Sequence, residues 1–198
     1  MPALNIEGHT YPDLLIPDGY RVVVDQLVTR DGKQVHIRRY QPEYLPQEAL
    51  NREHVTVLYG DGGHLYSYNA LTQPLTGALP TEKQAYAKAE QIWQEVNPAY
   101  RQELEQLRIL AGQTRTYVDA NGKTVVIPIL WAKYANTVHE GSYEWIGLGP
   151  DNHVIEFERE NYWDFEAGRE KTEMWFGDDW IKARRGLGPQ LQAPLPLA

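Results

Sequence analysis

Acidic residues alternate along a segment near the end of the chain and offer the clearest candidates for chemistry. Glu156, Glu158 and Glu160 are spaced two residues apart, so in a strand they would project from one face. Two such carboxylates lie about 7 Å apart, within the range used by the paired acids of glycoside hydrolases. Asp164 follows, and aromatic residues near it, among them Trp163, could stack on a sugar. The segment therefore gives the hypothesis of a carboxylate-dependent hydrolase of a sugar-like substrate, with Glu156, Glu158 and Asp164 as catalytic candidates.

The same alternation is also typical of an ordinary strand with one face exposed to solvent. Ile155 and Phe157 would then face the core, while the glutamates between them would form the solvated side of an antiparallel sheet. We favour this simpler interpretation, because strands of such sheets alternate in this way as a rule. It predicts that the glutamates carry no catalytic role.

Other catalytic and cofactor signatures are missing from the sequence. Cysteine is absent, and the two serines, Ser67 and Ser142, do not lie in a Gly-x-Ser-x-Gly motif. Neither a phosphate-binding loop nor a dinucleotide-binding fingerprint occurs, and the histidines contain no His-x-x-x-His pair. We therefore expect no cofactor and no metal site, and we favour a protein that is not an enzyme.

Two aromatic groups are candidates for a ligand site or an interface. The segment 125–134 is apolar on both faces, as in a buried strand or an interface, and Pro128 favours an edge strand. This segment is therefore a candidate surface for protein contact or self-association, with Trp131 and Tyr134 in the contact. Trp163, Trp175 and Trp180 form a second group, which could close the open face of the sheet or border a ligand groove.

Composition and charge exclude several classes of protein. The net charge of −8 is spread along the 198 residues, so the chain lacks the basic footprint that nucleic-acid binding requires. Apolar runs are too short to span a membrane. The first residues do not resemble a signal peptide, so we expect a cytoplasmic protein, or an extracytoplasmic one if a signal has been removed.

The periodicity predicts strands on either side of one good helix. Thr81 and Gln84 match a capping box that opens a helix over 82–97, and Asn97-Pro98 could start a further short helix whose period continues through Leu104 and Leu107. The expected strands are two hairpins over 21–40 and 55–68 and a meander over 114–118, 124–134, 143–148 and 153–160. Short helices are expected at 172–175 and 178–185.

Two strand-rich stretches resemble each other at a spacing of about ninety residues. The turn Asp31-Gly32-Lys33 aligns with Asn121-Gly122-Lys123, and the later pair Gly60 and His64 aligns with Gly149 and His153. Shared hairpin-turn chemistry could produce the same match without common origin, so both explanations stay open.

The helix opened by 80–85, the strands around 119–125 and the strand pair around 149–155 together resemble PepSY-type domains, which also occur in paired form in bacterial YcdB/YcdC-like proteins. The resemblance covers about 80–160 and, more weakly, 20–70. It implies a non-catalytic interaction or inhibitory module, usually extracytoplasmic, and brings no catalytic residues with it.

The sequence thus predicts an α+β protein with antiparallel sheets from two related β-rich halves packed on a central helix. Its expected parts are an irregular lead-in at 1–19, a first half at 20–78, the helix with the second half and an aromatic segment at 79–185, and a tail at 186–198. The expected function is non-catalytic binding or protein interaction. The alternatives are the hydrolase described above and a structural homodimer joined through 125–134.

Overall fold

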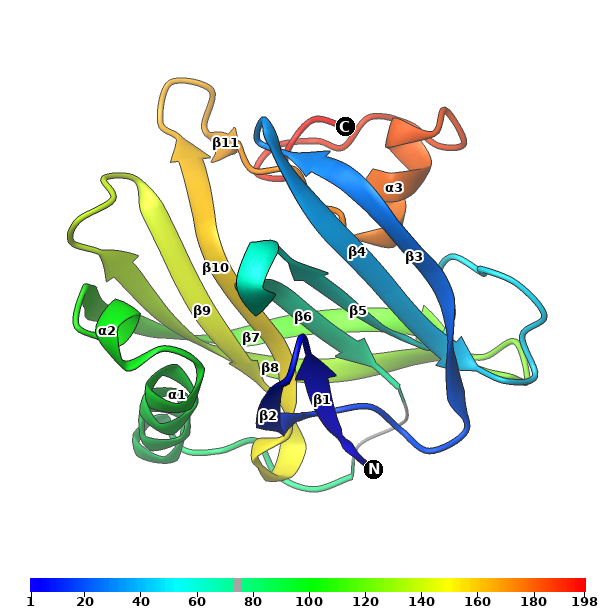
Figure 1. The fold of residues 1–198 in the computed structure, drawn as a ribbon, viewed down its shortest axis with the longest axis horizontal. Helices are drawn as coiled ribbons and strands as arrows, with labels where there is room; N and C mark the ends of the chain where they lie inside the picture. The colour runs from blue at the N-terminus through cyan, green and yellow to red at the C-terminus, as the bar shows by residue number, and fades with distance from the viewer. Residues whose placement is uncertain (73–75) are drawn as a thin grey trace.

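The computed structural model describes residues 1–72 and 76–198, and its main feature is one large antiparallel sheet. The strands follow the order β3-β4-β5-β6-β10-β9-β8-β7, and the short β11 pairs with β10 (Figure 1). Their bounds are Tyr20–Arg30 for β3, Lys33–Pro42 for β4, His54–Tyr59 for β5, Leu65–Leu71 for β6, Leu104–Val118 for β7, Thr124–Asn136 for β8, Ser142–Leu148 for β9, Val154–Asp164 for β10 and Arg169–Glu170 for β11. Together with the helices described below, this sheet confirms the α+β class.

Two kinds of turn join the strands. At the predicted β3–β4 turn, Asp31 and Gly32 both have positive φ, of 50° and 81°, as a type I′ turn requires. The β5–β6 and β9–β10 turns each contain a 3-10 turn, η1 (Asp61–Gly63) and η2 (Pro150–Asn152). They are closed by matching backbone bonds, Gly60 N to His64 O and Gly149 N to His153 O, both 2.8 Å long. The two aligned stretches thus share local structure, while their common origin stays a prediction.

The predicted helix over 82–97 is α1 (Glu82–Val96), and both bonds of the Thr81–Gln84 capping box are present. Its apolar face packs on the sheet through the buried residues Ala85, Ala89, Ile92 and Trp93. The next helix, α2 (Pro98–Arg101), is one turn long, and the Asn97 side chain accepts from Tyr100 N.

The expected helical continuation through Leu104 and Leu107 is wrong. Both residues lie in β7, where Leu104 pairs with Asn136 of β8. Leu104 is 6% exposed but Leu107 is 45% exposed, so the two side chains do not share one buried face as the helical period required. Pairing with β8 therefore overrides the local helical pattern.

The expected irregular lead-in is also wrong, because residues 1–19 contain a hairpin of β1 (Ala3–Ile6) and β2 (His9–Leu15). The turn residues Glu7 and Gly8 have φ of 49° and 88°. Pro12 lies at a register shift where it has no partner in β1, so it interrupts no pairing. Leu4, Ile6 and Leu14 of this hairpin are buried against the sheet.

Both faces of the sheet are covered by other parts of the chain. One face packs on α1 and the β1–β2 hairpin in the largest apolar cluster. Away from α1, α3 (Asp178–Arg184) and the carboxyl terminus lie near the ends of β3, β4 and β11 (Figure 1). The helix expected at 178–185 is therefore confirmed, whereas 172–175 contains no helix.

The longest helix of the described residues is α1, with 15 residues. In this part of the chain no helix has both the length and the apolar character needed to cross a membrane.

Candidate functional site: an aromatic pocket

The alternating glutamates of β10 do not form a solvated face, and our favoured interpretation of them is wrong. Glu156 and Glu158 are both 0% exposed. Ile155 and Phe157 do not share a face either: Phe157 lies in the cluster with α1, and Ile155 lies in a cluster with Ile127 and Ile129. The reason is a register shift between Val154 and Glu156, which changes the direction of the side chains before it.

A second irregularity separates Glu160 from the other two glutamates. The register of β10 shifts again between Glu158 and Asn161, and Glu160 has a positive φ of 57°. The Glu160 carboxylate lies 2.7 Å from His64 Nε2 and 3.6 Å from Lys33 Nζ. The three glutamates therefore do not form one catalytic row.

Each buried glutamate has its own set of partners. Glu156 Oε2 accepts from Trp131 Nε1 at 2.7 Å and from Trp145 Nε1 at 3.2 Å, and its Oε1 is paired with Arg115. Glu158 Oε1 accepts from Ser67 Oγ and Asn69 Nδ2 of β6. Burial raises the pKa of Glu158 well above its usual range, and the nearby Glu156 adds to this effect.

Asp164, the third catalytic candidate, has a local structural role. Its Oδ1 accepts from the backbone N–H groups of Glu166 and Ala167 and so closes the turn between β10 and β11. None of the three carboxylates has the convergent, accessible geometry that the hydrolase hypothesis needs.

Trp131 and Trp163, two of the predicted ligand-site residues, do come together around a cavity of about 150 Å³. We call this cavity the aromatic pocket; it is lined by Arg115, Trp131, Lys133, Tyr143, Trp145, Asn161, Tyr162, Trp163, Glu170, Met174, Phe176, Pro194 and Leu195. The indole rings of Trp131 and Trp145 lie 5.3 Å apart, and Glu156 holds both through their N–H groups. These two rings therefore form a rigid wall.

Three polar groups in the lining have no partner in the described part of the chain. Lys133 of β8 forms no hydrogen bond or ion pair there, and its ammonium lies 5.4 to 5.7 Å from the ring centroids of Trp131, Tyr143 and Trp145. Asn161 Nδ2 and Glu170 Oε1 are both buried without a partner. Buried polar atoms are normally satisfied, so the unpaired Asn161 Nδ2 and Glu170 Oε1, together with the partly buried and unpaired Lys133, make this cavity a candidate ligand site.

The Asn161 amide has a defined orientation. Its Oδ1 accepts from Arg30 at 3.3 Å, so its NH2 group is the end left free. Of these three groups, Lys133 and Asn161 offer donors and Glu170 offers an acceptor.

Burial changes the acidity of both ionisable groups in this set. It lowers the pKa of Lys133, and the nearby Arg108 lowers it further. It also raises the pKa of Glu170 to about 7, although Arg30, Lys133 and Arg115 act in the opposite direction. Both shifts arise from taking a charge away from water without giving it a close counter-ion.

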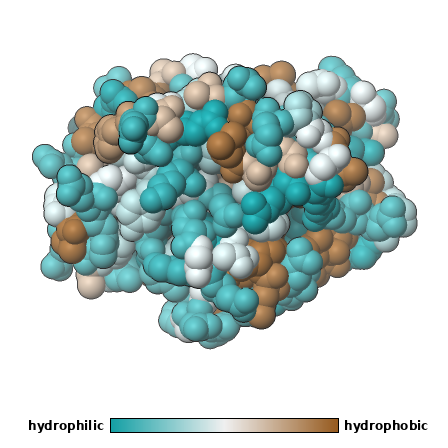
Figure 2. All heavy atoms as spheres, turned by 90° about the horizontal axis from the view of Figure 1, so that it is seen from above, coloured by the Kyte–Doolittle hydropathy of each residue, from teal (hydrophilic) through white to brown (hydrophobic). Residues whose placement is uncertain are grey.

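The carboxyl-terminal tail forms one wall of the aromatic pocket. Pro194 and Leu195 line the cavity, and Pro194 O accepts from Glu170 N at 2.8 Å. Leu197 O accepts from the indole of Trp180 in α3. Figure 2 shows the side of the molecule viewed from above, where apolar side chains lie in small groups between hydrophilic ones.

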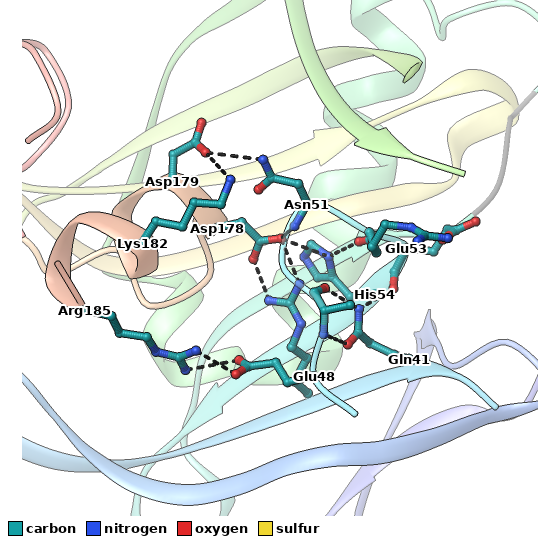
Figure 3. Close-up of polar contacts among 12 residues, drawn as sticks. Gln41, Glu48, Asn51, Glu53, His54, Asp178, Asp179, Lys182 and Arg185 are labelled. Carbon is teal, nitrogen blue, oxygen red and sulfur yellow. Dashed lines mark hydrogen bonds and ion pairs between the residues drawn. The ribbon is translucent and has the colours of Figure 1, made fainter. Parts of the chain in front are cut away.

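A buried polar cluster fixes α3, which in turn holds the tail. Asp178 at the start of α3 forms two bonds with the Arg39 guanidinium of β4, 2.6 and 2.8 Å long, and also accepts from Asn51 N. Figure 3 shows Asp178 beside Asn51 and His54, with Arg185 on Glu48 at the other end of the helix. Burial disfavours the charged carboxylate, but His54 and Arg39 beside it keep the pKa of Asp178 below its usual range.

The other predicted site residues serve the core. Tyr134 is 0% exposed and packs edge-on against Trp93 of α1. Trp180 is also 0% exposed, and Trp175 packs edge-on against it while donating to Thr29 O. These three residues therefore position the pocket without lining it.

The strand 125–134 is apolar on both faces because β8 is covered on both faces. It lies between β7 and β9, so the expectation of an edge strand is wrong. Pro128 is accommodated because β9 pairs only with residues 130–135 of β8, which leaves one side of the strand free at Pro128. Val126, which is 56% exposed, is a large apolar side chain that this segment presents to solvent.

Two larger cavities have volumes of about 330 and 350 Å³. They are less suited to bind a charged ligand, because charged side chains in their lining already have ion-pair partners. The first contains the Asp13–Lys88 ion pair, and the second contains Asp178, which is already bound to Arg39. Their charged lining groups are therefore largely neutralised by each other or by neighbours.

Sequence reasoning missed the three polar groups of the aromatic pocket. Lys133 was the one signal available, because it is a single charge inside the apolar segment 125–134. Asn161 and Glu170 could not be found, since they reach the cavity only after the bulge in β10 and the turn to β11.

The fold and site thus define an α+β protein with a small aromatic pocket. Comparisons with protein-family models, with curated proteins and with solved structures each gave no match for the chain.

Proposed function

We propose that the protein is a non-catalytic binding protein that holds a small ligand in the aromatic pocket. The observation that carries this proposal is the set of three unpaired polar groups, Lys133, Asn161 and Glu170, around one apolar cavity. A cavity of about 150 Å³ is comparable to an engineered one that accepts benzene, so the ligand is small. The PepSY-like interaction role remains a broader proposal, supported by α1 followed by the strands β7 to β10.

Methionine labelling tests the proposal with a built-in control. The chain has two methionines, Met174 in the aromatic pocket and Met1 in another cavity. We expect toluene, as a neutral apolar probe, to shift the ¹³C-methyl signal of Met174 in a saturable way while the Met1 signal stays unchanged.

Two matched substitutions in the tail locate the binding. Leu195→Trp fills part of the pocket wall and should weaken toluene binding several-fold, whereas Leu187→Trp, at a position 70% exposed, should not. The proposal fails if neither toluene nor the charged probes described below cause a saturable change at Met174, or if both variants bind toluene as the wild type does.

A further inference from the structure

The charged groups that line the aromatic pocket also indicate the class of ligand that it binds. Lys133 and Glu170 both line the cavity, yet they are not among the ion pairs of the described chain, so their charged atoms are more than 4.0 Å apart. Neither charge is neutralised by an ion pair in the described residues, so each can take a counter-charge from a ligand. Asn161 Nδ2 adds a second free donor.

This arrangement rules against two simple ligands. A plain carboxylate would satisfy Lys133 and Asn161 but would leave Glu170 buried without a partner. A plain amine would satisfy Glu170 but would meet the Lys133 ammonium, which already occupies the space beside three aromatic rings. Either ligand would leave a buried polar group unsatisfied, which costs binding free energy.

We infer that the ligand is a small zwitterion, an α-amino acid with an apolar side chain. Its carboxylate would accept from Lys133 and Asn161, its ammonium group would donate to Glu170, and its side chain would pack against the aromatic and aliphatic lining. This inference rests on the proposed function, because it names the ligand class of the same pocket.

The acidity of the two charged groups in the pocket is consistent with this inference. Burial moves both Lys133 and Glu170 toward their neutral forms. A ligand that brings a carboxylate to Lys133 and an ammonium group to Glu170 would favour the charged form of each.

Three probes that share the isobutyl group test the inference: L-leucine, 3-methylbutylamine, which lacks the carboxylate, and 4-methylpentanoate, which lacks the amine. Titrations at pH 7, followed through the Met174 methyl signal, should give L-leucine an affinity at least tenfold higher than either analogue.

Variants of the two charged groups should change this preference in opposite ways. In Lys133→Met, L-leucine should lose its advantage over 3-methylbutylamine, and in Glu170→Gln it should lose its advantage over 4-methylpentanoate. Lys123→Met and Glu166→Gln, at exposed turn positions, are the matched controls and should leave all three affinities unchanged.

The outcomes separate this inference from the proposed function. If toluene shifts Met174 but L-leucine binds no better than the analogues, the zwitterion inference is wrong and the binding function stands. If neither toluene nor any of the three probes affects Met174, both fail.

Discussion

His54 illustrates how a single side chain can be polar, buried and neutral at once. It is 2% exposed, and its Nδ1 lies 2.8 Å from Arg52 O, so the ring donates through Nδ1 and its Nε2 lacks a proton. Burial lowers the pKa of His54 to about 4, and the neighbouring Arg39 contributes, while Asp178 acts in the opposite direction. Although Asp178 lies 3.9 Å away, the two do not form an ion pair at neutral pH.

We predict that His54 makes the protein sensitive to acid. Its folded pKa lies below the usual value of about 6.5, so its contribution to stability is complete above that value and is lost as the pH falls toward 4. His54→Asn retains an N–H donor near the position of Nδ1 but cannot titrate.

Between pH 7 and pH 4, the free energy of unfolding of the wild type should therefore fall by up to about 3 kcal/mol more than that of His54→Asn. Urea unfolding at several pH values measures this difference. His9→Asn, at an exposed position, should follow the wild type; parallel curves for wild type and His54→Asn would contradict the prediction.

Residue patterns predicted the turns and helix caps well where these depend only on residues that are neighbours along the chain. The positive φ values at Asp31 and Gly32 and the capping box at Thr81 are such cases. The directions of Glu156 and Glu160 could not be predicted, because two register shifts in β10 depend on its pairing with β9. An alternating pattern assumes an unbroken strand, and here that assumption fails twice.

Among the elements, α3 has only seven residues and depends on contacts with the rest of the molecule. Its contacts include the ion pair of Asp178 with Arg39, whose side chains are 8% and 1% exposed, and the buried side chains of Trp180 and Ile181. A helix this short is not stable by itself. The position of α3, and with it the tail wall of the aromatic pocket, therefore depends on this buried pair as well as on apolar packing.

We predict that Asp178→Ala destabilises the protein by about 3 to 5 kcal/mol, because it leaves a buried guanidinium without a counter-ion. Asp179→Ala on the same helix is the matched control, since the Asp179 side chain is 74% exposed, and it should change stability by no more than about 0.5 kcal/mol. Chemical denaturation of the two variants gives the comparison. Equal effects would show that the Arg39 pair does not anchor α3.

Among the helices and strands, the sequence predicted most strands and both longer helices, but it did not predict the β1–β2 hairpin at the start of the chain. The helices at 82–97 and 178–185 have clear caps or apolar faces, and the structure contains both. The β1–β2 hairpin was not predicted because prolines are typical of irregular segments, and the sequence does not show that Pro12 lies outside the hairpin pairing. Likewise, Pro128 indicated an edge because the register of β9 on β8, which leaves Pro128 outside their pairing, could not be read from the sequence.

For the whole molecule, the important feature is the contact between β6 and β10. Three residue pairs register there, Ser67 with Glu158, Tyr68 with Phe157 and Asn69 with Glu156. The main apolar cluster also crosses this contact, since it includes Val57 and Tyr68 on one side and Trp93 and Phe157 on the other. The two sides therefore share one core.

We predict a single cooperative unfolding transition for residues 1–198, because neither side keeps a complete core without the other. In scanning calorimetry the calorimetric and van't Hoff enthalpies should agree. Glu158→Ala, which removes the acceptor of Ser67 and Asn69, should lower the midpoint without splitting the transition. Two resolved transitions would instead indicate two independent units.

Strand order has a consequence for the rate at which the chain folds. In the described part of the sheet, β6–β10 is the one pairing between strands that are not consecutive along the chain, and Ser67 and Glu158 are 91 positions apart. Each four-stranded meander can thus form through short loop closures, and one long closure remains. That closure brings a buried acid, Glu158, against the hydroxyl and amide that satisfy it, so the last major barrier to folding would include the desolvation of a carboxyl group.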